Sequence, residues 1–277
     1  MSTWEKLAAL PREIVLTIVL IAMIVPAIRP FRLPIMVGKM SKDWYNTVDS
    51  LPDSPLRHRI QLRGLSNPRP MRRRNPPQMF EKHLKIIIMA TQLEGSMMYP
   101  LIMEKVKPEK NYGAEYGKDY VFLGYIAGAQ TAMAAVLGDI HTAVKEDYYG
   151  TPIDQIPLLK EVKGPESYDL VAYLTTDGGI AEGWVYQAYS RYKLTVVGGF
   201  LSMMTPSLKP YYDAGALKGI LDGIKGAADM EYMTHHPGDA LRATDILSAT
   251  QTIVLIFIAI GNISYWGARL SKKEGES

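Results

Sequence analysis

A short polar and glycine-rich stretch could hold a small polar ligand. Its residues are Thr176, Asp177, Gly178 and Gly179. They follow an apolar stretch and open a helical one, where backbone N–H groups and the positive helix end attract anions. There is no GxGxxG pattern and Asp177 would repel phosphate, so the alternative is a tight turn with a helix cap. Gly124 and the pair Gly198-Gly199 end two further apolar stretches, which we expect to be neighbouring strands lining the same crevice, or to pack against helices.

A repeat of small residues predicts a close contact between helices. Gly215, Gly219, Gly223 and Ala227 recur every four residues, so on one helix they would form a smooth stripe. Each glycine in a helix interior costs about 1 kcal/mol relative to alanine, so the stripe should be compensated by tight packing. We expect it to contact either the domain's own sheet or another protomer or subunit.

A basic segment is the second candidate interface. Its densest part contains Arg69, Arg72, Arg73 and Arg74. Acidic partner surfaces and anionic lipid headgroups are the expected partners, and a solvated charged face is the alternative. A net charge of +3 is too small to indicate a nucleic-acid partner, so none is expected.

The sequence shows no complete catalytic or metal-binding set. Because cysteine is absent, disulfides, thiolate metal sites and cysteine nucleophiles are excluded. His235, His236 and Asp239, like Asp139 with His141, lack the spacing of known metal motifs. We therefore expect no catalytic residue, no metal and no cofactor.

Two stretches are apolar enough to predict transmembrane helices. Ile14–Ile28 is uncharged but shorter than the about 20 residues that usually cross a bilayer, whereas Ile246–Ala268 is long enough. We read the first as an uncleaved anchor, because no small-residue cleavage site follows it. Asn262 in the second should bond across to the first span or cap near the interface. Because short tails follow the positive-inside rule, we expect cytoplasmic termini and an extracytoplasmic domain.

Apolar strand patterns alternate with helical ones between the two spans. The predicted strands are His58–Leu65, Lys85–Ala90, Tyr120–Tyr125, Tyr168–Thr176 and Leu194–Ser202. The predicted helices are Ser41–Leu51, Pro77–Leu84, Met98–Val106, Gly128–Asp147, Ile180–Tyr192 and the stretch from Pro206 onward. This alternation predicts a three-layer α/β domain, Rossmann-like or flavodoxin-like, with a parallel sheet. The expected division is 1–37 for the tail and first span, 38–240 for the domain, and 241–277 for the second span and tail.

Several motifs resemble those of a family of prokaryotic two-pass membrane proteins with a Rossmann-like domain between the spans. The motifs are YGKDYVFLGY from Tyr116, GTP from Gly150, GIKGAADME from Gly223 and GNI from Gly261. The resemblance covers most of the chain and implies two anchors around an α/β domain, but no activity. The segment Arg57–Arg74 departs from it by being more basic.

Two functions fit these features. The first is a membrane-anchored interaction or scaffold subunit, which would bind the lipid bilayer and form a homo-oligomer or join other membrane subunits. The alternative is a tethered sensory domain that binds a small polar or anionic ligand. An enzyme ranks last, because no acid–base pair or cofactor fingerprint is present.

Overall fold

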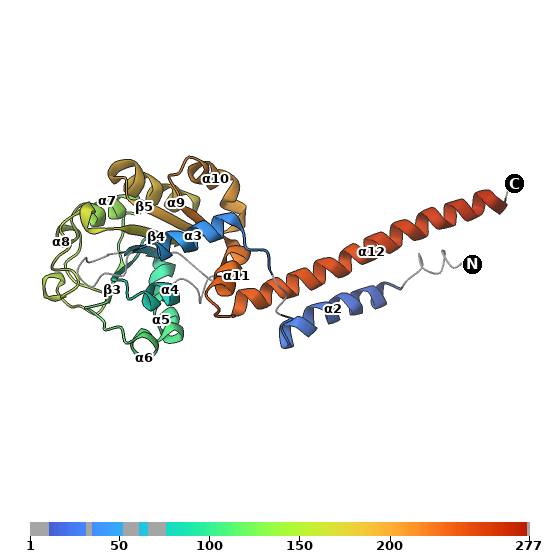
Figure 1. Cartoon of the computed structure of the whole chain (residues 1–277), viewed down its shortest axis with the longest axis horizontal. Coiled ribbons are helices and arrows are strands. Elements are labelled where there is room, and N and C mark those ends of the chain that lie inside the picture. The colour runs from blue at the N-terminus through green and yellow to red at the C-terminus, as the bar shows by residue number, and fades with distance from the viewer. Residues whose placement is uncertain (1–10, 32–34, 52–60, 66–75, 276–277) are drawn as a thin grey trace. The chain divides into compact units, whose positions relative to one another are not determined.

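The computed structural model describes residues 11–31, 35–51, 61–65 and 76–275. The chain divides into two compact units. Ile35–Ala240 form the α/β domain, and Met1–Pro34 together with Leu241–Ser277 form the other unit. Figure 1 labels the elements of both.

The described part of the domain contains a six-stranded sheet in which every strand pair is parallel. The strand order is β3-β2-β1-β4-β5-β6, so the chain builds the sheet outward from β1 in one direction and then from β4 in the other. The predicted α/β class with a parallel sheet is confirmed. The strands are β1 (Gln61–Leu65), β2 (Ile86–Ala90), β3 (Tyr120–Tyr125), β4 (Leu170–Thr175), β5 (Thr195–Phe200) and β6 (Gly219–Asp222).

Five of the strands coincide with predicted ones to within a few residues. Four of them, β2 to β5, lie in mainly apolar runs, because a parallel sheet with helices on both faces has no solvent-facing side. All residues of β2 and of β4 are buried, for example.

Two groups of helices cover the two faces of the sheet (Figure 1). On one face, α5 contacts β1, β2 and β3, while α3 and α11 contact β5 and β6. On the other, α9 contacts β4 and β5. The first group comprises α3 (Lys39–Asp49), α4 (Pro76–Glu81), α5 (Leu93–Val106), the short α6 (Pro108–Tyr112) and α11 (Gly223–Met233). The second comprises α7 (Gln130–Gly138), α8 (Ile140–Ala143), α9 (Gly178–Trp184), the π-helical turn η4 (Val185–Ser190) and α10 (Thr205–Asp213).

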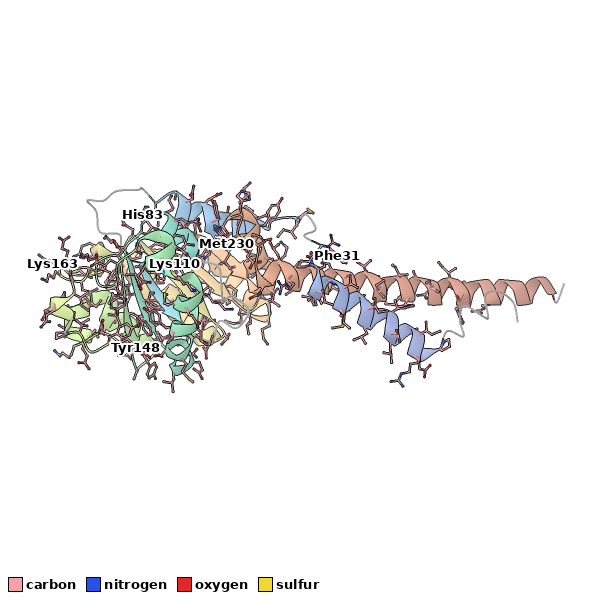
Figure 2. The ribbon with its side chains drawn as sticks, turned by 90° about the horizontal axis from the view of Figure 1, so that it is seen from below. Phe31, His83, Lys110, Tyr148, Lys163 and Met230 are labelled. Carbon is pink, nitrogen blue, oxygen red and sulfur yellow. The ribbon has the colours of Figure 1, made fainter. Side chains whose placement is uncertain are left out.

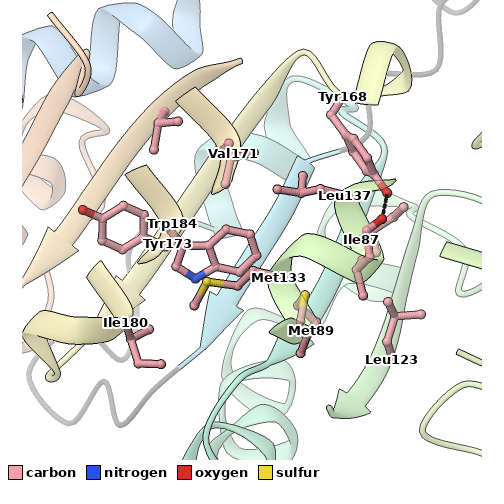
Figure 3. Packing of buried hydrophobic residues seen from close by; sticks show 14 of the residues in the cluster. Ile87, Met89, Leu123, Met133, Leu137, Tyr168, Val171, Tyr173, Ile180 and Trp184 are labelled. Atoms are coloured by element: carbon pink, nitrogen blue, oxygen red, sulfur yellow. Dashed lines mark hydrogen bonds between the residues drawn. The ribbon is translucent and has the colours of Figure 1, made fainter. Parts of the chain in front are cut away.

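The larger buried cluster fills the space between the sheet and α7, α9 and η4 (Figure 3). Trp184 and Met133 project from the helices toward Val171 and Tyr173 of β4. The Tyr168 hydroxyl donates a hydrogen bond to the Val136 carbonyl at 2.9 Å, which ties the start of β4 to α7 (Figure 3). Three 3₁₀ turns complete the loops: η2 (Ile153–Gln155), η3 (Pro165–Ser167) and η5 (Ser202–Met204).

The predicted glycine-striped helix does not exist. Gly215 lies in a turn with φ +77°, Gly219 begins β6, Gly223 begins α11 with φ +50°, and Ala227 lies inside α11. The four-residue repeat therefore spans a turn, a strand and a helix, and its members share no helix face. The prediction was wrong because only two apolar residues, Ile220 and Leu221, lie between Gly219 and Gly223, too few to show a strand period. An interface role for these residues stays an untested prediction.

Two of these glycines nevertheless allow close packing inside the domain. A Cβ added to Gly219 would lie 2.6 Å from the Cβ of Trp44 and closer still to its backbone, so α3 can lie on β6 only because Gly219 has no side chain. A Cβ on Gly223 would similarly collide with Ser202. These contacts join the first helix of the domain to its last strand.

The chain segment that leads into α3 is bound by α11. The Gly38 N–H donates to Asp229 Oδ2 at 3.0 Å, and the Lys225 ammonium donates to the Met36 carbonyl at 2.7 Å. Lys225 and Asp229 also form an ion pair, and the Asp229 side chain is 1% exposed. The GIKGAADME motif thus supplies a clamp for the segment Met36–Gly38.

In the second unit, α12 (Asp239–Gly275) is a single long helix. Its part Asp239–Gly267 is long and apolar enough to cross a membrane, and among the described residues no other helix passes that test. The helix α2 (Arg12–Ile28) is 17 residues long, which is shorter than a membrane span usually is. Many of its apolar side chains are exposed. The prediction of two flanking spans is thus supported for one of them. Asn262 donates to the Ile258 carbonyl of its own helix at 2.8 Å, and its two expected roles, a bond to the first span or a cap near the interface, stay predictions.

Replacement of Gly219 by alanine should destabilise the domain. The new Cβ would collide with the Trp44 backbone, and such overpacking costs about 1–3 kcal/mol. Chemical denaturation of the full chain in detergent measures the loss. Gly178→Ala is the control, because no atom of the described residues lies within 4 Å of a Cβ there, and it should change stability by less than about 0.5 kcal/mol. Equal stability of the two variants would contradict the packing described here.

Candidate functional site

The candidate site lies where the strand order reverses, at the carboxyl ends of β1 and β4. The two strands pair in register, with Leu65 beside Leu174, so they end together at one edge. In open parallel sheets ligands bind outside this edge, at the point of reversal. The segment that follows β1 contains Arg69, Arg72, Arg73 and Arg74, which lie outside the described residues, so their predicted role stays a prediction.

The loop after β4 is a hydrogen-bonded turn that caps α9. The Asp177 N–H donates to Thr175 Oγ1 at 3.0 Å, and Asp177 Oδ1 accepts from the Ile180 N–H at 3.0 Å. The cap that the sequence offered as the alternative is therefore present. The Asp177 side chain accepts only from the Ile180 N–H of α9. The N–H groups of Gly178 and Gly179 also lie in the first turn, where backbone N–H groups have no intrahelical acceptor. They can serve an external acceptor.

Open space lies beside this turn. Among the residues that the structure describes, a Cβ added to Gly178 would have no atom within 4 Å, and Asp177 and Gly179 are exposed. The Gln130 amide, from the start of α7, donates to the Gly179 carbonyl at 3.5 Å. The Gln130 side chain also packs against Gly183, where a Cβ would lie 2.7 Å from its Cγ. The turn is thus contacted by Gln130 at Gly179, whereas the space beside Gly178 is open among the described residues.

The structure does not bring Gly124 to this turn. Gly124 lies in β3, at the edge of the sheet, with β2 and β1 between it and β4. Three strand spacings separate β3 from β4, about 14 Å. Gly124 has φ +78° beside a register shift with β2, and its nearest neighbour is Tyr148. It borders a separate hollow of about 370 Å³ formed with residues 143–147.

Gly198 and Gly199 also do not line the crevice together with Gly124, because β5 and β3 are not neighbouring strands. Gly198 makes room for the ring of Tyr173, since a Cβ there would lie 2.6 Å from the tyrosine oxygen. Gly198 thus packs against β4, the neighbouring strand of the same sheet, and the expected packing of the two glycines against helices stays a prediction. Burial raises the pKa of Tyr173 well above its usual range, so the hydroxyl stays protonated inside the core.

Two of the motifs that carry the family resemblance, the stretch from Tyr116 and the GTP stretch from Gly150, meet at the β3 edge. The Tyr116 hydroxyl donates to Asp147 Oδ2 at 2.8 Å, and Asp147 Oδ1 accepts from the N–H groups of Tyr149 and Thr151. The Tyr148 N–H donates to the Phe122 carbonyl at 2.9 Å. Burial, together with the hydrogen bond to Asp147, raises the pKa of Tyr116. These bonds satisfy backbone groups that an edge strand would otherwise expose.

The histidines take part in local hydrogen bonds. His141 Nδ1 lies 2.8 Å from Asp154 Oδ1, and its Nε2 lies 3.0 Å from the Leu159 carbonyl. His236 Nε2 lies 3.6 Å from Glu81 Oε1. Across the described ranges, no three His, Asp or Glu side chains are grouped as metal ligands.

Comparison with known proteins adds no relative to this picture. No family model, curated protein or solved structure matched the chain.

Sequence reasoning missed the clamp formed by Lys225 and Asp229. Its signal was present, because the two residues stand four apart in a helix-forming stretch, where opposite charges pair. That Met36 and Gly38 would be bound there could not be read from the sequence, since they lie about 190 residues away.

Proposed function

We propose that the chain is a membrane-tethered protein whose Rossmann-like domain binds a small polar or anionic ligand beside Thr176–Gly179. The observation that carries this proposal is the reversal of strand order between β1 and β4, with the open turn after β4 at that point. In parallel sheets with this strand order a crevice forms between the two central strands, because the connection after one strand goes to one face of the sheet and the connection after the other goes to the opposite face.

The groups in the turn favour a ligand with both acceptors and donors. The N–H groups of Gly178 and Gly179 would bind a carbonyl, carboxylate or hydroxyl oxygen. The negative charge of Asp177 favours a hydroxyl or amino group and disfavours a bare phosphate. Sugars, nucleosides and hydroxy acids meet these conditions. Binding rather than catalysis is proposed, because Asp177 is the one titratable residue of the turn and it serves as a helix cap.

A thermal-shift screen of the full chain with sugars, nucleosides and carboxylates tests this function. A ligand at 100 times its Kd adds about 2.7 kcal/mol to the stability, which for a domain of this size raises Tm by about 5–10 °C. Gly178→Leu should remove the shift by filling the open space while leaving the unliganded Tm nearly unchanged.

Lys163→Gln, at an exposed position outside the turn, is the control and should keep the full shift. The proposal fails if none of the three ligand classes raises Tm, or if Gly178→Leu responds as strongly as the unmodified chain.

An interaction or scaffold role is the second candidate function, and a row of exposed apolar side chains on α5 favours it. Leu93, Met97 and Leu101 stand four residues apart on its outer face and are 60%, 68% and 43% exposed. The opposite face of α5, with Tyr99 and Ile102, is buried against the sheet. An apolar stripe on a charged surface is typical of a protein contact, and we propose that a second copy or another membrane subunit covers it.

Met97→Glu should therefore reduce the size of the assembly. A charge in the centre of an apolar interface weakens association, whereas at an exposed position it changes folding stability by less than about 0.5 kcal/mol. Light scattering after size exclusion in mild detergent measures the mass. Met203→Glu, at a residue that is 81% exposed outside α5, is the control. A chain that is monomeric without any substitution would contradict this role.

Two anchors with cytoplasmic termini and an extracytoplasmic domain complete the proposal. The apolar, exposed side chains of α2 support a second membrane segment beside α12. Helix α2 could enter the bilayer if its ends are extended by flanking residues, because apolar segments that are too short are accommodated by thinning and snorkelling.

Single cysteines can test this topology cleanly because the chain has none of its own. In cells, a membrane-impermeant maleimide should label Lys163→Cys, and should label Ser2→Cys and Ser277→Cys only after permeabilisation. If Ser2→Cys and Lys163→Cys are labelled alike while Ser277→Cys differs, α12 is the single span and the two-anchor arrangement is wrong.

A further inference from the structure

A second cleft lies at the opposite edge of the sheet from the proposed ligand site. Helices α5 and α11 each follow a strand and run back along the sheet, so they end at its amino edge. The cleft has a volume of about 830 Å³, within the range of small-molecule sites. It is lined by the ends of α4, α5 and α6 and by the turn that precedes α12. The lining residues used below are Glu81, Glu104, Lys105, Lys107, Tyr112 and His236.

The charges of this cleft are balanced and only partly paired. Lys105 lies 4.0 Å from Asp239, and His236 lies 3.6 Å from Glu81. Glu104 and Lys107 form no ion pair with any residue that the structure describes, and both are exposed. The cleft therefore offers one free carboxylate and one free ammonium group.

The end of α5 also contributes the negative end of a helix dipole to the cleft. The helix stops at Lys107, which has a left-handed conformation with φ 47°, and the Asn111 side chain donates to the Val106 carbonyl at 2.7 Å. The negative end of the helix dipole favours positive charge at this point. The helix end and Glu104 would both stabilise a positive group, whereas a negative group would be stabilised by the ammonium group of Lys107.

The position of the cleft in the chain indicates what occupies it. Pro237 and Gly238 line it and directly precede Asp239, the first residue of the segment that can cross a membrane. The headgroup layer of a bilayer is about 5–7 Å thick on each side, so a residue within a few positions of a span can reach it. The partner with the right chemistry in that layer carries one phosphodiester and one ammonium group.

We propose that this cleft binds the headgroup of a zwitterionic phospholipid, with Lys107 contacting the phosphodiester and Glu104 the ammonium group. Tyr112 offers an aromatic face on the wall of the cleft. The site is distinct from the proposed ligand turn, and it rests on the membrane association of α12.

Native mass spectrometry of the full chain in mild detergent tests the proposal. The chain should retain a lipid with a phosphoethanolamine headgroup in preference to one with phosphoglycerol. The double variant Glu104→Gln/Lys107→Gln should bind it about ten-fold more weakly, as expected for the loss of two exposed charge contacts. Soluble phosphoethanolamine in excess should displace the lipid, which shows that the headgroup is recognised.

A matched control removes the same charges elsewhere. The control variant is Lys163→Gln/Glu166→Gln, at two exposed positions. Lys163 lies at the end of the domain away from Met230 of α11 (Figure 2). The chain with these two substitutions should retain the lipid fully. Equal retention of the two headgroups, unchanged binding by the Glu104/Lys107 variant, or no displacement by soluble phosphoethanolamine would each overturn the proposal. Because the measurement is made in detergent, its failure is distinct from failure of the membrane topology or of the ligand turn.

Discussion

Burial of a parallel sheet on both faces is the constraint on which the domain depends. Strands such as β2 and β4 are buried along their whole length, so helices must cover each face of the sheet. The last strand, β6, is covered by α3, which precedes the first strand in the chain. That cover depends on Gly219, because any side chain there would collide with Trp44. One missing Cβ thus lets the beginning of the domain close over its end.

The same end of the sheet holds the chain where it enters the domain. Asp229 is almost completely buried yet charged, and such a group is tolerated only when it is paired and hydrogen-bonded. Lys225 and the Gly38 N–H provide these partners. At the other end of the domain sequence, Lys105 lies close to Asp239, the first residue of α12. The domain therefore makes polar contacts with Gly38, near its first residue, and with Asp239, near its last.

Much of the fold could be predicted, but the candidate site only in part. Apolar runs such as Ile86–Ala90 identify buried strands, because a parallel strand that is buried on both faces has apolar side chains at consecutive positions. The turn Thr176–Gly179 was predicted from glycine and a capping aspartate, which are local signals, and the cap is present. Gly124 was assigned to the same crevice wrongly, because the order of strands in a sheet is not a local property. β6 was missed because its glycines matched a helical period.

The sequence by itself determined the class of the fold, the positions of most strands and helices, and a long apolar segment after Asp245. These follow from hydrophobic patterning, which acts on residues close together in the chain. The tertiary structure alone decided the strand order, the packing of α3 on Gly219, the clamp on Gly38 and the cleft beside α5. Each of these joins residues far apart in the chain, and packing between distant segments leaves no periodic signal in any one of them.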